Sequence, residues 1–180
     1  MPARIALLRA INLGGKTSVP MTALRAAVQA AGLADVETLL QSGNLVFRSD
    51  ERDLAALEML LERAFAERFG FSTDIFVRTA AEWAALIDAN PFLEMAERDP
   101  GHLVLFSLKA EPSEEGVAAL RTAIRGPEFF EARGRHLYVA YPDGIGRSKL
   151  TSAVIEKRLG TRGTGRNWNT VLKLMDMVRE

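Results

Sequence analysis

The chain has 180 residues, which is enough for one domain or for two small subdomains that share a core. Its 23 basic and 23 acidic side chains cancel, which argues against a protein that holds long nucleic acid by bulk charge alone. The 48% of hydrophobic residues is typical of a globular chain, and the lack of cysteine excludes disulfides, thiolate metal sites and cysteine nucleophiles. No apolar run approaches the roughly 18 residues of a membrane helix, and the first residues lack a signal-peptide pattern. We therefore expect a cytoplasmic protein with no membrane association.

The first part of the chain predicts alternating strands and helices. Short apolar or alternating runs predict strands over residues 5–9, 36–40, 45–47 and 74–78. Apolar residues at helical spacing predict helices over residues 21–31 and 54–69. Gly32 and Gly70 end the two helices, and Ser42-Gly43 joins the middle strands in a hairpin turn. The resulting β-α-β-β-α-β order is the split, ferredoxin-like pattern.

The remainder of the chain repeats part of that pattern. Thr79 and Glu82 form a capping box for a short helix that ends at Asn90-Pro91. Strands are predicted over residues 103–108, 129–132 and 137–141, and helices over residues 114–124, 148–159 and 167–178. We therefore predict an α+β protein with two related ferredoxin-like (split β-α-β) subdomains, residues 1–79 and 80–180, packed together and with a helical C-terminus.

Charge is unevenly distributed along the neutral chain. Residues 50–143 carry ten basic and 18 acidic side chains, whereas residues 144–180 carry eight basic and three acidic ones. A basic C-terminal segment suits an anionic ligand, but it is equally explained by a solvated helical face beside an acidic neighbour.

Residues 10–17, with the sequence AINLGGKT, satisfy a relaxed phosphate-loop pattern. In a true phosphate loop the Lys-Thr pair opens a helix, whereas here Pro20 would interrupt such a helix after its first turn. The β-α-β-β-α-β order also differs from the parallel sheet of nucleotide-hydrolysing enzymes. We therefore do not expect a nucleotide-hydrolysing phosphate loop.

The same loop is of interest because of the predicted topology. In a split β-α-β unit the end of the first strand lies beside the start of the third, so two loops distant in sequence should meet at one sheet edge. Their glycines would let the backbone approach a ligand. The side chains could form an anion pocket, or they could merely satisfy turn backbone and solvent. This candidate group comprises Arg9, Asn12, Gly14, Gly15, Lys16, Gln41, Ser42 and Asn44.

A second candidate group lies near the C-terminus, in Arg166-Asn167-Trp168-Asn169-Thr170. Asn167 is a good N-cap for the last helix, and Trp168 could stack on a base while Arg166 and Asn169 bind polar groups. The competing interpretation is a capped helix with Trp168 in the core. Lys149 is expected in the first turn of a helix, where a cation is unfavourable unless it faces an anion.

Catalytic constellations are not recognisable. His102 and His136 are the only histidines and lack metal-ligand spacing, and Gly-x-Ser-x-Gly is absent. We therefore expect neither a bound metal nor a cofactor, and whether the protein is an enzyme stays open.

The chosen motifs together resemble one family. Residues 8–16 (LRAINLGGK), 19–21 (VPM), 40–44 (LQSGN) and 166–170 (RNWNT) match the pattern of the domain-of-unknown-function 1697 family over essentially the whole chain, with Ala10 where that family usually has Gly. The resemblance implies a bacterial, cytosolic α+β protein with two related subdomains and supplies no established activity.

Three functions follow as hypotheses. The first is binding of an anionic ligand, such as a nucleotide, a phosphorylated metabolite or a short nucleic-acid segment. The second is a phosphoester-processing enzyme in which Lys16 and Arg166 stabilise charge. The third is a structural or protein-interaction module in which the motifs cap turns. The oligomeric state is not predicted.

Overall fold

The computed structural model describes residues 1–14 and 18–179. The chain divides into two compact units, the first comprising Met1–Ala85 with Leu174–Glu180 and the second comprising Leu86–Lys173. The sequence-based division between residues 79 and 80 remains a prediction.

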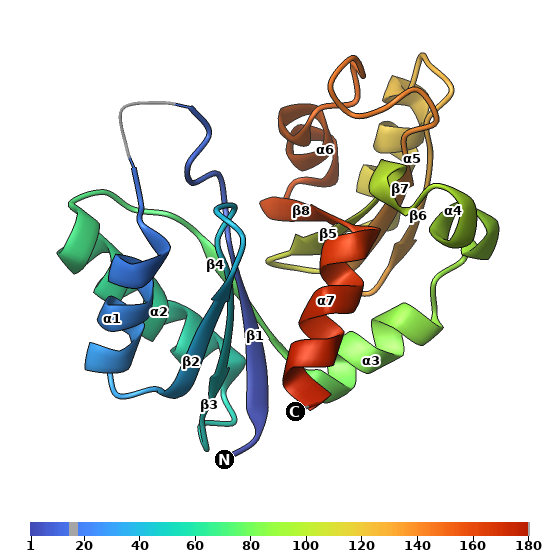
Figure 1. The fold of residues 1–180 in the computed structure, drawn as a ribbon. Coiled ribbons are helices and arrows are strands. Elements are labelled where there is room, and N and C mark those ends of the chain that lie inside the picture. The colour runs from blue at the N-terminus through green and yellow to red at the C-terminus, as the bar shows by residue number, and fades with distance from the viewer. Residues whose placement is uncertain (15–17, 180) are drawn as a thin grey trace. The chain divides into compact units, whose positions relative to one another are not determined.

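The first unit follows the expected element order. Its elements are β1 (Ala3–Leu8), α1 (Met21–Ala30), β2 (Ala34–Leu39), β3 (Asn44–Arg48), α2 (Leu54–Phe69), β4 (Ile75–Thr79) and the first part of α3 (Ala80–Asp88). The strands form an antiparallel sheet in the order β2-β3-β1-β4, so that β3 lies between β1 and β2. This is the split β-α-β arrangement that the sequence predicts. Helices α1 and α2 lie on one face of the sheet (Figure 1).

The core of the first unit lies between this sheet and its two helices. Ala6 and Leu8 alternate along β1, while Leu57, Leu61 and Phe65 recur at helical spacing along α2, and all five are buried in one cluster. The two periods, about 2 for a strand and 3.6 for a helix, bring these apolar side chains into one layer. Hydrophobic burial between sheet and helices therefore holds the strand ends in place.

Helix α2 also protects the free edge of the sheet. The carboxylate Oε1 of Glu62 accepts from the N–H of Ile75 at 2.9 Å, and Oε1 of Glu58 accepts from the N–H of Val77 at 2.9 Å. Two N–H groups of the edge strand β4 thus bond to side chains of this chain, which hinders pairing with a foreign strand.

The second unit repeats the strand order of the first. Its elements are the end of α3, α4 (Leu93–Arg98), a short 3₁₀ helix (Pro100–His102), β5 (Leu103–Leu108), α5 (Glu114–Ala123), β6 (Phe129–Arg133), β7 (His136–Ala140), α6 (Ser152–Leu159), β8 (Gly163–Asn167) and the first part of α7 (Trp168–Arg179). The antiparallel sheet has the order β6-β7-β5-β8, so β5, β6, β7 and β8 occupy the places of β1, β2, β3 and β4. The two units are therefore related in topology, as the sequence suggests.

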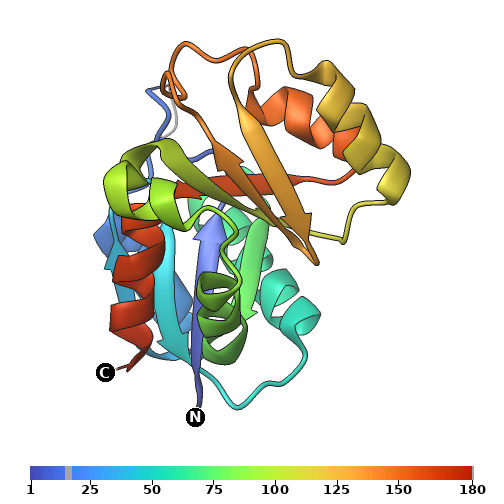
Figure 2. The ribbon, with the colours of Figure 1, turned by 90° about the vertical axis from the view of Figure 1, so that its right-hand side faces the viewer.

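Helices α5 and α6 lie side by side on one face of the second sheet (Figure 2). A Cβ at the buried Gly116 of α5 would stand 3.2 Å from the carbonyl oxygens of Arg158 and Leu159 in α6. The missing side chain at Gly116 allows the two helix backbones to approach closely. Beneath them Phe106, Leu120 and Ile155 belong to one buried cluster.

The structure corrects two predicted elements. Residues 163–167, where the sequence predicted no strand, form the strand β8, and α6 begins at Ser152 rather than at residue 148. Glycine disfavours strands, so the pattern concealed β8. A Cβ at Gly165 would stand 2.9 Å from side-chain carbons of both Phe106 and Val104, so large neighbours on β5 fill the space that a side chain on β8 would take.

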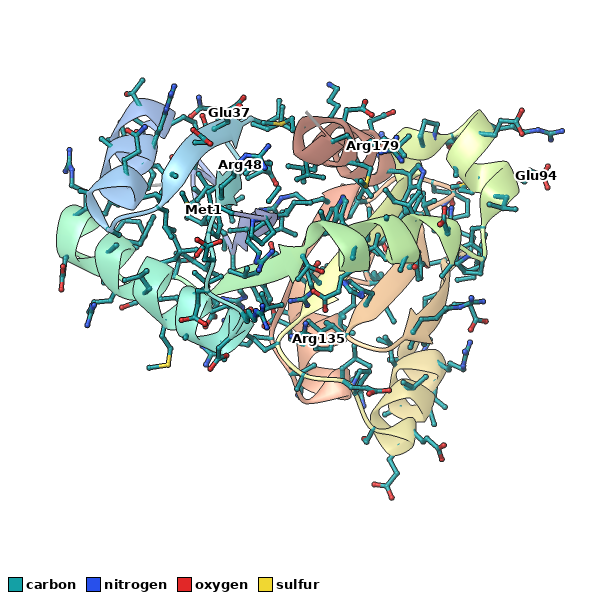
Figure 3. The ribbon with its side chains drawn as sticks, turned by 90° about the horizontal axis from the view of Figure 1, so that it is seen from below. Met1, Glu37, Arg48, Glu94, Arg135 and Arg179 are labelled. Atoms are coloured by element: carbon teal, nitrogen blue, oxygen red, sulfur yellow. The ribbon has the colours of Figure 1, made fainter. Side chains whose placement is uncertain are left out.

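Local signals predicted from the sequence are confirmed elsewhere. The capping box is formed, because Glu82 Oε2 accepts from the N–H of Thr79 at 2.9 Å and Thr79 Oγ1 accepts from the N–H of Glu82 at 3.0 Å. At the surface of the first unit Arg48 lies near Met1 (Figure 3) and donates to its carbonyl. Arg48 also pairs with Asp35 at 3.5 Å.

The α+β class, with two four-stranded antiparallel sheets and a helical C-terminus, is thus confirmed. In residues 1–14 and 18–179, no helix combines the length and the apolarity needed to span a lipid bilayer.

Candidate functional site

The two N-terminal loops meet, as the topology predicts. The side-chain amide of Asn12 donates to the carbonyl of Gln41 at 2.8 Å, although 29 residues separate them. The N–H of Leu8 donates to the carbonyl of Gly43 at 2.9 Å. The loop after β1 is therefore tied to the turn before β3.

The polar groups of Asn12 are directed at the backbone. Besides the bond to Gln41, Asn12 Nδ2 donates to the carbonyl of Val19 at 2.9 Å, and Oδ1 accepts from the N–H of Val19 at 2.7 Å. One side chain thus joins residue 12 to Val19 and to the neighbouring turn at Gln41. These bonds favour the turn-stabilising interpretation of Asn12 over a direct contact with a ligand.

Asn44 and Gly43 form the turn itself. Asn44 is fully buried, and its Nδ2 donates to the Leu39 carbonyl at 2.7 Å and to the Ser42 hydroxyl at 3.0 Å. Gly43 has a φ of 85°, and a Cβ there would stand only 2.6 Å from Ile11 Cδ1. A residue with a side chain would therefore force the two loops apart.

The remaining members of the N-terminal group occupy different environments. Arg9 is half-buried, and its carbonyl accepts from the hydroxyl of Thr73 while its N–H donates to the Asp74 carbonyl. Gly14 is exposed at a φ of 76°, and the side chains of Gln41 and Ser42 are exposed. Gly15 and Lys16 lie outside the described residues.

The C-terminal group lies at the junction of β8 and α7. Asn167 caps the helix, because its Oδ1 accepts from the N–H of Thr170 at 3.1 Å. The indole of Trp168 is only 4% exposed and lies 6.3 Å from the ring of Tyr138, which is a core environment. Asn169 is exposed.

Arg166 is also buried, with 7% of its surface exposed. Its Nη1 donates to the Thr164 hydroxyl at 2.7 Å and to the Gly165 carbonyl at 2.9 Å. Burial lowers the pKa of Arg166 to about 10, so the guanidinium is charged at neutral pH. The structure therefore places a desolvated cation on β8.

Lys149 lies in a different place from the one expected. It precedes the N-cap Thr151 of α6 and so belongs to the loop after β7, not to the first turn of a helix. The loop borders a cavity of about 560 Å³ in the second unit. The other wall of the cavity is formed by the segment between α5 and β6, around Arg125, Gly126 and Glu128.

Three cations line this cavity, namely Arg125, Arg147 and Lys149, together with the carboxylates Glu128 and Asp143. Glu128 Oε1 accepts from the Ser148 hydroxyl at 2.6 Å, and Ser148 Oγ in turn accepts from the N–H of Leu150 at 3.0 Å. One carboxylate is thus occupied in fixing the loop that carries Arg147 and Lys149. The three cation side chains are exposed.

The sequence did not single out Arg125 or Arg147 as ligand-binding residues. Arg147 lies in the Gly-rich segment that contains Lys149, a signal available in the sequence. Arg125 follows a helix end about 20 residues earlier, and only the tertiary structure brings it to the same cavity. Among the described residues, no group of three or more histidine, aspartate or glutamate side chains is placed to hold a metal ion.

Comparisons with known proteins place the chain in a family. A sequence model of a protein family described as "Protein of unknown function (DUF1697)" matches residues 1–138. The chain belongs to the DUF1697 family. The match contains the N-terminal motifs and ends before the Arg166–Thr170 motif, so it covers less of the chain than the resemblance suggested. In this DUF1697 protein Ala10 has a φ of 54°, a conformation that glycine adopts most readily, which explains why glycine suits that position.

A solved structure supports the fold over the full length of this DUF1697 protein. It is described as "The structure of conserved bacterial protein SP0830 from Streptococcus pneumoniae" and is 23% identical, with a TM-score of 0.78. The similarity covers 100% of this chain and 99% of that chain. No curated protein matches the chain. At this identity the comparison supports the fold alone.

Proposed function

We propose that this protein binds a small phosphate-bearing ligand in the cavity of its second unit. The observation that carries the proposal is that Arg125, Arg147 and Lys149 line one cavity of about 560 Å³. This volume lies within the range of roughly 300–1,000 Å³ that is common for small-molecule sites. The proposal retains the anionic ligand expected from the sequence and assigns it to the cavity around Lys149.

The cavity offers chemistry suited to phosphate. The planar guanidinium of an arginine can bind two phosphate oxygens at once, and lysine adds a point charge. The three cations of the lining outnumber its two carboxylates, Glu128 and Asp143, and Glu128 also fixes the loop by accepting a hydrogen bond from Ser148. We infer that Arg147 and Lys149 are the principal anion-binding residues, with Arg125 on the opposite wall.

The test is calorimetric titration with inorganic phosphate and pyrophosphate at low salt. We compare the wild type with the double variant Arg147→Ala, Lys149→Ala. The matched control is Lys157→Ala, Lys173→Ala, which removes the same charge from exposed positions of the second unit outside the cavity lining. We expect the first variant to lose at least tenfold in affinity and the control to lose less than twofold. Equal losses in the two variants, or a wild type that binds neither anion, would overturn the proposal.

Salt dependence separates a small ligand from a nucleic-acid segment. A phosphorylated metabolite that contacts three cations should show a shallow decrease of affinity with salt, whereas a nucleic acid should show a steep one. A phosphoester-processing activity at the same site, the alternative expected from the sequence, would appear as hydrolytic release of inorganic phosphate when the protein is incubated with a phosphate ester. A cytoplasmic location, as expected from the sequence, is part of this proposal.

A second role has its own support, namely that the polar motifs around Asn12, Asn44 and Asn167 stabilise the fold. The amides of Asn12 and Asn44 and the carbonyl oxygen of the Asn167 side chain are hydrogen-bonded within the chain. We infer that these residues serve as structural elements of an interaction or binding module. Their variants should lose thermal stability without a change in phosphate affinity.

A further inference from the structure

A histidine and an aspartate form a pair beside Gly144, which lines the cavity, although His102 and Asp99 are not themselves lining residues. Nδ1 of His102 lies 2.8 Å from Oδ2 of Asp99, across the short 3₁₀ helix that leads into β5. The carboxylate can only accept, so the tautomer of the uncharged imidazole that this bond favours carries its proton on Nδ1 and leaves Nε2 as a hydrogen-bond acceptor. The pair is therefore set to receive a proton donor at Nε2.

The position of Nε2 follows from its neighbour Gly144. A Cβ added at Gly144 would stand 3.5 Å from Nε2 and 4.0 Å from each of the two ring carbons beside it. Nε2 is therefore the ring atom nearest to the position that a Cβ of residue 144 would take. Gly144 itself lines the cavity that Arg147 and Lys149 border. The N–H of Tyr141 donates to the His102 carbonyl at 2.8 Å, and the N–H of Gly144 donates to the Tyr141 carbonyl at 2.9 Å. These bonds hold the Gly144 turn beside the imidazole.

Within residues 1–14 and 18–179, no group is hydrogen-bonded to Nε2. The His102 side chain is 43% exposed, and that of Asp99 is 45% exposed. Gly144 has no side chain to cover the ring, and its φ of 84° makes any other residue there strained. The hydrogen bond that Asp99 accepts from His102 is thus explained by the local turn, whereas Nε2, which has no partner among the described residues, is not needed for that turn.

We propose that the ligand of this cavity is a phosphate ester that carries a hydroxyl group close to its phosphate, and that His102 Nε2 accepts the hydrogen bond of that hydroxyl. The cations hold the phosphate, and His102 recognises the polyol or sugar part of the ligand. Asp99 acts as a positioning residue, because it fixes the tautomer of His102. This inference rests on the proposed phosphate site.

The experiment compares two ligands of equal chain length, glycerol 3-phosphate and propyl phosphate, which differ only in their hydroxyl groups. For the wild type we expect glycerol 3-phosphate to bind roughly five- to tenfold more tightly, the gain from one well-placed hydrogen bond. In His102→Ala the two affinities should become equal, while that for propyl phosphate stays within twofold of the wild type. Asp99→Asn, which keeps an oxygen acceptor for Nδ1–H, should retain the preference, and Asp99→Ala should reduce it.

The outcomes separate the two proposals. A wild type that binds neither ligand contradicts the proposed function. A wild type that binds both equally, or a His102→Ala variant that keeps the preference, contradicts the role of His102 and leaves the phosphate site standing. A ratio of affinities is insensitive to a general loss of stability, so a merely structural role of the Asp99–His102 pair would not change it.

Discussion

The side-chain amide of Asn12 and the main-chain carbonyl of Gln41 lie 2.8 Å apart and join two loops that the chain separates by 29 residues. Asn12 itself has a φ of 54°, a left-handed conformation that asparagine tolerates better than most residues. The residue thus combines a backbone requirement with three hydrogen bonds. This combination explains why a short polar motif is needed at the end of β1.

The first prediction concerns Asn12. Asn12→Gly keeps the left-handed backbone accessible but removes the hydrogen bonds, which should cost about 1–3 kcal/mol of unfolding free energy. Asn12→Ala should cost about 1 kcal/mol more, because alanine is strained at this φ. Gln41→Ala is the control, since it keeps the carbonyl that accepts from Asn12. In thermal melts the melting temperature should fall by about 2–4 °C for each kcal/mol of lost stability. A Gln41→Ala loss as large as that of Asn12→Gly would contradict the prediction.

The second prediction compares two glycines with similar backbone angles. Gly43 and Gly70 have φ values of 85° and 78°, but a Cβ at Gly43 would meet Ile11 Cδ1 at 2.6 Å, whereas nothing lies within 4 Å at Gly70. Gly70→Ala should cost about 1 kcal/mol for the strained backbone alone. Gly43→Ala should cost a further 1–3 kcal/mol or so for the overlap. Urea unfolding of both variants measures the difference, and equal losses would show that the loops separate freely.

The third prediction distinguishes two neighbouring asparagines. Asn167 accepts from the N–H of Thr170, whereas Asn169 is exposed. Asn167→Ala should lower the unfolding free energy by about 1 kcal/mol, the usual value for a lost N-cap. Asn169→Ala, the control on the same turn, should change it by less than about 0.5 kcal/mol. A larger loss from Asn169→Ala in calorimetric melts would mean that α7 is held by contacts other than its cap.

The fourth prediction concerns alkaline pH. Burial raises the pKa of Tyr138 from 10.0 to about 12 and that of Tyr141 further, while the hydroxyl of Tyr138 donates to the Leu86 carbonyl. Below pH 10 the tyrosines are neutral in both states. Between about pH 10 and 12 they ionise in the unfolded chain only, so the unfolding free energy should fall as pH rises. The lowered pKa of Arg166 has the opposite effect on the unfolding free energy, because the folded state then loses its proton first. Since two tyrosines oppose this one arginine, we expect a net decrease.

Tyr138→Phe tests the assignment. The variant should be less stable at about pH 8, because the bond to Leu86 is lost, and its stability should decline less steeply above about pH 10. Urea midpoints across this range give the slope. An unchanged slope would show that Tyr138 does not carry the alkaline transition.

Much of the fold was predictable because its signals are local. The alternation along β1, the helical spacing of Leu57, Leu61 and Phe65, and the reciprocal bonds of Thr79 and Glu82 each depend on residues close in the chain. Strand order followed from element order, since a split β-α-β unit has few ways to pair its strands. The meeting of the two N-terminal loops was a direct consequence, and Asn12 confirms it.

The tertiary structure decided those features that depend on contacts between residues far apart in the chain. Gly163 and Gly165 made the strand β8 hard to predict from the sequence. Their lack of side chains is explained by close neighbours in the fold, namely Leu108, Phe106 and Val104. Likewise Arg125 and Lys149, 24 positions apart, line one cavity because β6, β7 and the loop between Tyr141 and Leu150 return the chain to the end of α5. The sequence by itself therefore determined the class, the strand order and the turn motifs through local periodicity and capping. The choice between a polar side chain that binds a ligand and one that satisfies the backbone was made by packing, because the same amide or guanidinium serves either purpose until its neighbours are in place.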